Sequence, residues 1–440
     1  MPPKRAKEST VLDRISNLPI NIIGIILSHL PLHVAVQTST LSRKWRLHWT
    51  RTKTLVIDQD FVVDIYRGKE DENTSTYVDI VGNIVLSHLG LIRKFELHVP
   101  YFEDDILAVV NLWILAVSRQ GVQHLMLHYH YDYHAKVPSY LFQCTELKHL
   151  GLMFVERSPH SFEVFSSLIS LELDCRNISE DYVTNIILMC PLLEKLDVCY
   201  ISKDGTFAIN APELKYFAAL YKGHTDFILK NTPNLSVVYL MLAKTDHEYG
   251  HQECPDIVDF FAAVPKIEEI NLSGTVLLEW GVQDVPNMLP VPLEHHASLT
   301  VLRWETHSPA QVRSMFCLIN SSPLLQTLDI SMDGPYSQPE NTIGYLKSQR
   351  REEKNIWSLR NVEVTELMGT EPEIILIEII LSCCPLLEKL NLGSHYHISS
   401  DAEIKMMTDI MQLPRASIQA KLIYSKSEEP RNETPLDWLV

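Results

Sequence analysis

The chain has no long apolar run and no secretory leader. Its apolar stretches fall short of the roughly 18 consecutive residues that cross a membrane, and residues 1–7 lack the apolar segment of a signal peptide. The eight cysteines form no Cys-x-x-Cys pair, and most stand inside apolar segments, where a free thiol behaves as a small hydrophobe. These absences argue against membrane insertion and secretion, and they favour the reducing nucleus or cytoplasm.

Motifs of catalysis are missing as well. There is no Gly-x-x-x-x-Gly-Lys loop, no Gly-x-Ser-x-Gly turn and no pair of carboxylates whose spacing demands acid–base work. The segment His247–His251 matches the letters His-Glu-x-x-His of zinc peptidases. That chemistry requires both histidines on one helix face, whereas Gly250 and the polar stretch 244–256 favour a surface insertion. A zinc hydrolase is thus the minor alternative.

Four further histidines stand close together in the chain and are interleaved with tyrosines: His124, His128, His130 and His134. The first two are expected to point outward from a strand and the others to lie beyond its end. We interpret the group as a solvated or partner-binding surface, with a metal site as the alternative. The sequence therefore predicts no catalytic residue, no metal site and no cofactor.

Charge is distributed unevenly along the chain. The net charge is −17, yet residues 1–53 hold nine Lys/Arg against two acidic residues, a net of +7, which leaves −24 for residues 54–440. Two units with different partners are therefore expected. Because an acidic body repels phosphate backbones, nucleic acid is a poor ligand and a basic or neutral protein is a better one. The alternative is that acidity serves only solubility.

An internal repeat dominates the rest of the sequence. The pattern apolar-x-x-apolar-x-apolar occurs twelve times, at intervals of 21 to 34 residues, close to the leucine-rich-repeat range of about 20–29. The motifs begin at Ile92, Val122, Leu147, Leu168, Leu193, Leu214, Leu235, Ile267, Leu299, Leu325, Leu359 and Leu387. Three copies, Cys190–Val198, Ser322–Ile330 and Cys384–Leu392, share nearly the same letters. Coincidence is therefore improbable.

The spacing inside each motif predicts the fold. Apolar and polar residues alternate, as in a strand with one buried face, while apolar residues recur with helical spacing from Ile106 to Val117. Each unit is therefore expected to be a helix, a turn and a short strand, and stacked units share one core. The predicted fold is an α/β leucine-rich-repeat solenoid, with a curved parallel sheet and outer helices. Leu55–Ile57 should open the sheet, and Ala416–Tyr424 should close it.

A small helical module precedes the repeats at residues 13–53. Between two Leu-Pro pairs, the apolar residues fall on one helical stripe: Ile22, Ile23, Ile26, Leu27 and Leu30. Two further helices are predicted at Val34–Ser39 and Leu41–Trp49. Each is too short to stand alone, so the three must pack together or dock on a partner. A helical cap on the solenoid is the alternative interpretation.

This module resembles an F-box of the plant type. The resemblance is carried by the segments Leu18–Pro31 and Ala35–Arg46 and by Trp49. It implies binding to a Skp-type adaptor, which links the chain to a cullin scaffold and a RING protein. The adaptor contacts that it implies are Leu18, Pro19, Ile22, Ile26 and Leu30, with Trp45 locking the third helix.

The C-terminal part is similar to the FBD region that follows the repeats in many plant F-box proteins. Trp357–Val364, the predicted helix Glu371–Ser382 and the closing strand carry this similarity. We expect an F-box at 13–53, leucine-rich repeats at 54–350, an FBD-like region at 351–425, and tails at 1–12 and 426–440. The resemblance implies a non-catalytic substrate-recognition subunit of a cullin-RING (SCF-type) ubiquitin ligase. A repeat scaffold that binds proteins without ligase assembly is the alternative.

The sheet surface is the expected target-binding site. Positions three, five and seven of each motif face outward, because strand side chains alternate. In the sixth and seventh motifs this gives an apolar, aromatic patch of Tyr216, Leu220, Val237, Tyr239 and Met241, and the third adds His149 and Met153. Acidic residues are expected around it: Glu172, Asp174, Glu269, Glu305, Asp329 and Glu363. Such a composition favours an unknown, basic protein target.

Overall fold

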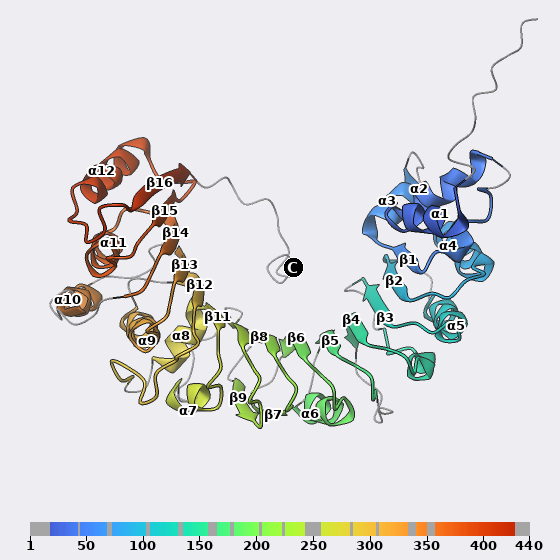
Figure 1. The fold of residues 1–440 in the computed structure, drawn as a ribbon, viewed down its shortest axis with the longest axis horizontal. Coiled ribbons are helices and arrows are strands. Elements are labelled where there is room, and N and C mark those ends of the chain that lie inside the picture. The colour runs from blue at the N-terminus through green and yellow to red at the C-terminus, as the bar shows by residue number, and fades with distance from the viewer. Residues whose placement is uncertain are drawn as a thin grey trace, which may run out of the picture. The chain divides into compact units, whose positions relative to one another are not determined.

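The computed structural model describes residues 18–42, 45–67, 73–102, 106–130, 135–156, 165–176, 180–201, 205–221, 225–242, 257–281, 285–304, 308–332, 340–349 and 357–426. The chain divides into two compact units, 1–176 and 177–440 (Figure 1). Among the described residues, no helix has the length and apolar character needed to cross a membrane.

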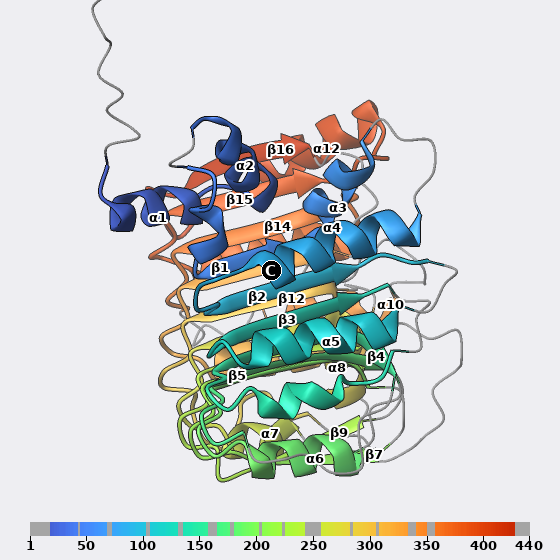
Figure 2. The ribbon, with the colours of Figure 1, turned by 90° about the vertical axis from the view of Figure 1, so that its right-hand side faces the viewer.

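The first unit begins with short helices and continues as a parallel sheet in the order β1-β2-β3-β4-β5. Its elements are α1 (Ile20–Ser28), α2 (Leu32–Gln37), η1 (Thr38–Thr40), η2 (Trp49–Arg51), β1 (Thr54–Ile57), α3 (Gln59–Tyr66), α4 (Thr74–Ser87), β2 (Lys94–Val99), α5 (Leu107–Ser118), β3 (His124–Tyr129), η3 (Ser139–Gln143), β4 (His149–Glu156) and β5 (Ser170–Arg176). Helices α4 and α5 cover one face of this sheet (Figure 2). The predicted opening strand is confirmed, since Leu55 pairs with Phe95.

The second unit is also a parallel sheet, in the order β6-β8-β10-β11-β12-β13-β14-β15-β16. Its elements are α6 (Glu180–Met189), β6 (Lys195–Ile201), β7 (Gly205–Asn210), β8 (Tyr216–Tyr221), β9 (Thr225–Lys230), β10 (Val237–Leu242), α7 (Ile257–Ala262), β11 (Glu269–Ser273), α8 (Gly274–Trp280), β12 (Ser298–Trp304), α9 (Pro309–Asn320), β13 (Thr327–Met332), α10 (Glu340–Gln349), β14 (Asn361–Leu367), α11 (Glu371–Cys383), β15 (Lys389–Ser394), α12 (Ser400–Met411) and β16 (Lys421–Lys426). Its helices lie on one side of the strands (Figure 1). The predicted solenoid of strands and outer helices is confirmed.

Local sequence explains where several helices begin. Asp58 caps α3 by accepting a hydrogen bond from the Phe61 amide at 2.8 Å. At the start of α11, Glu373 Oε2 accepts a hydrogen bond from the Thr370 amide at 2.8 Å. Such caps satisfy amides that have no partner within the helix, and each contributes about 1 kcal/mol. The helices are therefore fixed at the positions from which they can cover the sheet.

Alternation along the strands builds the core. In β2, β3, β10 and β13 every second residue is buried, as the repeat pattern predicts. The first leucine of the motif is buried too, for example Leu214 and Leu235, both 0% exposed. Each repeat thus adds three apolar side chains to a continuous interior, and the alternate residues face outward.

The short repeats contain strands where helices were predicted. β7 and β9 form a separate parallel pair, with Phe207 and Phe227 both buried and their ring centroids 5.9 Å apart. The motifs beginning at Leu193, Leu214 and Leu235 are only 21 residues apart. This length leaves too few residues for a helix and its two connections, so a short strand covers the core instead.

The repeat predicted to begin at Leu299 has the wrong register. Leu299 pairs with Ile270 and Val301 pairs with Leu272, which are positions four and six of the preceding motif. The repeat therefore begins at His296, which is 0% exposed and occupies the position of the usual leucine. Because a histidine stands where the pattern requires an apolar residue, the sequence pattern placed the start of this repeat three residues too late, at Leu299. Glu305, assigned to the sheet surface on that register, lies outside the described residues.

Two helix or strand boundaries also differ from expectation. Residues 45–48 form turns, in which the His48 amide donates to the Trp45 carbonyl, and they lead into η2, so the third predicted helix is absent from the described part of Leu41–Trp49. The closing strand exists and pairs with β15, but it starts at Lys421 and not at Ala416. The predicted helix at 371–382 is confirmed as α11.

Candidate functional site

Helix α1 has a buried face and an uncovered apolar face. Ile23 and Leu27 are buried and pack with Ala35 and Trp45 into a small core. On the same helix, Ile22 and Ile26 are each 38% exposed, and the neighbouring Ile20 and Ile25 are 56% and 55% exposed. One short helix therefore presents isoleucines in two directions, and the second set stays partly exposed within the described chain.

The predicted adaptor residues divide into two groups. Ile22 and Ile26 point away from the core, whereas Leu18 and Leu30 are half-buried and pack against it. Pro19 is exposed, and its carbonyl accepts hydrogen bonds from the amides of Ile22 and Ile23, which starts the helix. These contact assignments stay a prediction. Ile20 and Ile25 were missed because they lie beside the stripe that the sequence pattern selected.

Residues 50–53 tie this module to the first repeat. The Thr50 carbonyl accepts hydrogen bonds from the amides of Leu89 and Gly90, and the Lys53 carbonyl accepts from Lys94. A Cβ at Gly90 would lie 3.0 Å from the Cα of Arg51, so any larger residue there would press against the backbone of Arg51. The end of the module is thus built into the solenoid.

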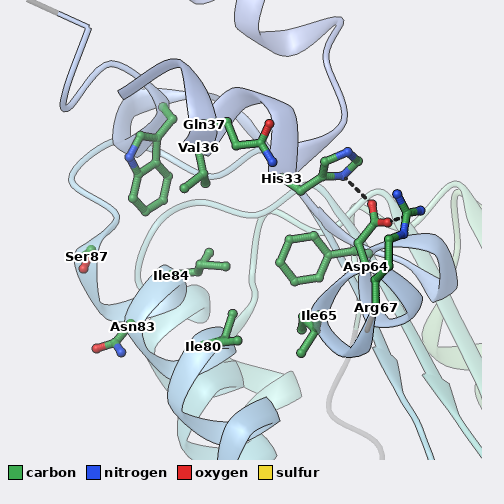
Figure 3. A pocket seen from close by; sticks show the side chains of 12 residues that line it. His33, Val36, Gln37, Asp64, Ile65, Arg67, Ile80, Asn83, Ile84 and Ser87 are labelled. Carbon is green, nitrogen blue, oxygen red and sulfur yellow. Dashed lines mark ion pairs between the residues drawn. The ribbon is translucent and has the colours of Figure 1, made fainter. Parts of the chain in front are cut away.

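A cleft of about 800 Å³ separates the module from helices α3 and α4 within the first unit. Ile65, Ile80 and Ile84 line its floor, as Figure 3 shows. At its rim Asp64 pairs with His33 at 3.2 Å and with Arg67 at 2.5 Å (Figure 3). The His33–Asp64 pair joins α2 to α3, and the cleft between these helices is mainly apolar.

The predicted target patch lies on two adjacent strands of the second unit. Val237 pairs with Tyr216 and Met241 pairs with Leu220, so all five predicted residues stand on neighbouring positions of β8 and β10. Each is half-buried, and the rings of Tyr216 and Tyr239 have centroids 5.4 Å apart. The structure therefore brings these residues together, and their role in target binding stays a prediction.

A carboxylate adjoins the patch on the next strand. The Tyr239 hydroxyl donates to Glu269 Oε1 at 2.7 Å, and Asn271 Nδ2 donates to the same oxygen at 3.0 Å. Burial and this carboxylate together raise the pKa of Tyr239 to about 12, so the phenol keeps its proton. The two donors hold the carboxylate of Glu269 in one orientation beside the aromatic rings.

Two more carboxylates face outward farther along the sheet. Asp329 on β13 pairs in register with Glu363 on β14, and Asn391 Nδ2 on β15 donates to Glu363 Oε2 at 3.2 Å. Burial, with Glu363 adding to it, raises the pKa of Asp329 to about 6. A carboxyl group whose pKa is raised in this way has no nearby cation that stabilises its ionised form.

Two further predicted acids lie in the first unit, and one cation of the second unit was not predicted. On β5, Glu172 is half-buried, but Asp174 is 0% exposed, so the prediction that Asp174 faces outward is wrong. Lys195, on β6, was not predicted, yet its Nζ lies 5.1 Å from the centroid of the Tyr216 ring. Position three of the preceding motif could have revealed it, since Lys195 pairs with Tyr216 in register.

The histidines of the first unit lie on its sheet surface. His124 contacts Glu96 at 3.3 Å and its ring is 5.5 Å from that of His149, while His128 is 6.5 Å from His98. Burial lowers the pKa of His98 to about 4, with His128 and His130 contributing. The described residues contain no cluster of three or more His, Cys, Asp or Glu able to hold a metal. His134 and the segment His247–His251 lie outside those residues.

Comparisons with known proteins agree with this architecture. The F-box domain model matches residues 15–56, and the model "FBD-associated F-box protein At5g56370, LRR repeats" matches residues 110–330. The F-box/FBD/LRR-repeat protein At1g13570 of Arabidopsis thaliana is 29% identical, with 94% of this chain and 98% of that protein covered. The FBD-associated F-box protein At4g13985 of the same plant is 24% identical over 92% and 95%. The chain therefore belongs to the family of F-box/FBD proteins with leucine-rich repeats.

Proposed function

We propose that this chain is the substrate-recognition subunit of a cullin-RING ubiquitin ligase in the nucleus or cytoplasm. Its F-box binds a Skp-type adaptor, and its repeats bind a target protein. The observation that carries the proposal is the uncovered isoleucine face of α1 on a module with its own small core. An apolar face of this kind is typical of a helix that docks on a partner.

The protein itself supplies proximity and no chemistry. Ligation would take place at a conjugating enzyme that the RING partner brings, and the repeats would raise the local concentration of target lysines there. The free cysteines of the described chain support a binding role, since burial raises the pKa of the Cys144, Cys190 and Cys317 thiols. Such thiols are poor nucleophiles.

Pull-down with a plant Skp-type adaptor tests the proposal. The full chain should capture the adaptor, whereas a chain lacking residues 1–48 should not. The deletion stops before Thr50 because residues 50–53 hold the first repeat. Circular dichroism should show that the shortened chain keeps its helices and sheet. Adaptor capture by the shortened chain would contradict the F-box role.

Reconstitution then separates the ligase from a plain scaffold. With cullin, RING protein and conjugating enzyme added, the adaptor complex should transfer ubiquitin to the chain itself or to a bound target. A complex that binds the adaptor and supports no transfer would argue for a repeat scaffold without ligase assembly. Failure to bind any Skp-type adaptor would argue for the same alternative.

A further inference from the structure

The carboxylates of the second unit differ in whether they have cations. At the edge where strands begin, Glu194 pairs with Lys215 at 2.9 Å and Glu388 with Arg360 at 2.7 Å. On the outward sheet face, Glu269 accepts hydrogen bonds from a phenol and an amide, Glu363 accepts one from an amide, and Asp329 pairs in register with Glu363. In the part of this unit that the structure describes, none of these three forms an ion pair with Lys, Arg or His. The face therefore offers negative charge that the fold leaves unneutralised.

One cation already lies on this face. The ammonium group of Lys195 stands over the Tyr216 ring at 5.1 Å, and the Tyr239 ring lies 5.4 Å from that of Tyr216. Aromatic faces attract ammonium and guanidinium groups, and arginine does so most often. The aromatic pair is thus built to hold a cation, and the ordered carboxylate of Glu269 borders it on the side away from Lys195.

Strand register gives the separation between the two acidic positions. Glu269 on β11 and Asp329 on β13 are two strands apart, and Asp329 stands two residues farther along its strand. Two strand spacings of about 4.8 Å and two residues of about 3.3 Å give a diagonal of about 12 Å. In an extended peptide, residues i and i+4 are about 13 Å apart and face the same side. The two distances match.

We propose that the target enters this face as an extended segment with two cationic side chains four residues apart. The first cation lies against Glu269, beside Tyr239, and the second lies against Asp329, beside Glu363. Apolar side chains of the segment then contact Leu220 and Met241. This inference rests on the proposed function, because it names the chemistry that the repeats recognise.

The second position also predicts a dependence on pH. Asp329 faces Thr300 on β12 and Glu363 on β14, and Glu363 faces Asn391 on β15. Since its pKa is raised to about 6, a proton competes with the incoming cation near neutral pH. Binding should therefore weaken as the pH falls from 7 to 5.

Labelled synthetic peptides test the spacing on the full chain in complex with its adaptor. One peptide carries two arginines at i and i+4 in a serine/threonine host with a phenylalanine. The matched control has the same composition with the arginines at i and i+3, which places them on opposite faces of an extended chain. Fluorescence anisotropy should give an affinity about ten-fold higher for the i+4 peptide.

Substitutions locate the effect. Asp329→Asn and Glu269→Gln should each reduce the preference for the i+4 peptide to about three-fold or less and flatten its salt dependence. Equal affinity for the two spacings, including no measurable binding of either, would overturn the inference. So would a preference that survives both substitutions. Adaptor capture by the same preparation reports on the proposed function separately, since it depends on α1.

Discussion

Helix α1 and the sheet face of the second unit are both incomplete, in opposite ways. The helix exposes Ile22 and Ile26 on a module whose small core, Ile23, Leu27, Ala35 and Trp45, is buried. The sheet face presents oriented phenol and carboxylate groups, with Glu269 and Asp329 lacking a cation in the described chain. An exposed apolar surface favours binding to a folded partner that covers it, and a fixed charge favours binding to a side chain of opposite sign.

The interior of the repeats provides the contrast. Alternate strand residues such as Leu97, Leu272 and Leu392 are almost fully buried in the interior of the repeats. Substitution there should mainly change the free energy of unfolding, whereas substitution on the two surfaces should have its larger effect on binding. The two kinds of site can therefore be separated by measuring both quantities on each variant.

The largest effect is expected at α1. The double substitution Ile22→Asp with Ile26→Asp should weaken adaptor binding by about 4 kcal/mol or more, because two charges would replace apolar anchors in a desolvated contact. Both side chains are partly exposed in the free chain, so the free energy of unfolding should change little. Isothermal titration with the adaptor and urea unfolding give the two quantities.

Ile23→Ala on the same helix is the matched control. Ile23 is 2% exposed, so its truncation should destabilise the module by about 2–4 kcal/mol. Binding should fall only as far as the module unfolds. Normal adaptor binding by the double aspartate variant would mean that this helix face is exposed to solvent in the assembled complex. Helix α1 would then not be a binding surface.

Much of the fold can be predicted from the amino-acid sequence alone. The repeated motif predicted the strands, their parallel order and the buried residues, as Phe95 and Leu97 illustrate. Periodicity works here because every repeat must bury the same face. The Tyr216 and Tyr239 neighbourhood was also predictable, since consecutive motifs become adjacent strands.

Other features depended on information that periodicity lacks. A buried histidine at a leucine position shifted the register at His296, and the short spacing after Leu193 replaced a helix with β7. The ring contact of Lys195 involves the neighbouring strand, and the raised pKa of Asp329 comes from burial and from Glu363 on the next strand, so neither is visible in one motif. Local sequence patterns therefore predict the fold of the repeats, whereas the electrostatics of the sheet surface can be worked out only once the strand register is known.

His296 tests the interior side of the comparison. Burial lowers its pKa to about 4, while its ring contacts Ser322 Oγ at 2.6 Å and the Ser298 carbonyl at 3.0 Å. Between pH 6.5 and 4 the unfolded chain therefore binds the proton more tightly than the folded protein. As the pH is lowered through this range, the free energy of unfolding should decrease by up to about 3 kcal/mol. His296→Leu should remove that part of the slope in urea unfolding. Parallel pH profiles for the two proteins would show that His296 titrates normally.

The aromatic pair is expected to have a smaller effect, on binding alone. Tyr216→Ala with Tyr239→Ala should weaken binding of the first target identified by proximity labelling by at least about 2 kcal/mol, because the rings form the centre of the patch. Adaptor affinity should not change. His149→Ala, on the sheet face of the first unit, serves as the control. Should the control weaken target binding and the tyrosine variant not, the target site would belong to the first unit.

The smallest effect distinguishes the two kinds of carboxylate. Because the pKa of Asp329 is raised to about 6 in the fold, the folded protein binds the proton more tightly than the unfolded chain between about pH 4 and 6. The ionised group therefore destabilises the fold at pH 7. Asp329→Asn should raise the free energy of unfolding there by about 1 kcal/mol, a figure reduced for partial exposure, and the gain should vanish below about pH 4.

Glu388→Gln is the opposite case, since it removes an exposed ion pair with Arg360 and should lower stability by less than about 1 kcal/mol. Urea unfolding of both variants at pH 7 and pH 4 compares them directly. A stabilising Asp329→Asn together with a neutral or slightly destabilising Glu388→Gln means that the fold tolerates an unfavourable charge only on the sheet face. Such a charge is expected where a partner neutralises it. If Asp329→Asn instead destabilises the protein at pH 7, the fold itself satisfies that carboxylate, and the sheet face has no need of a cationic target.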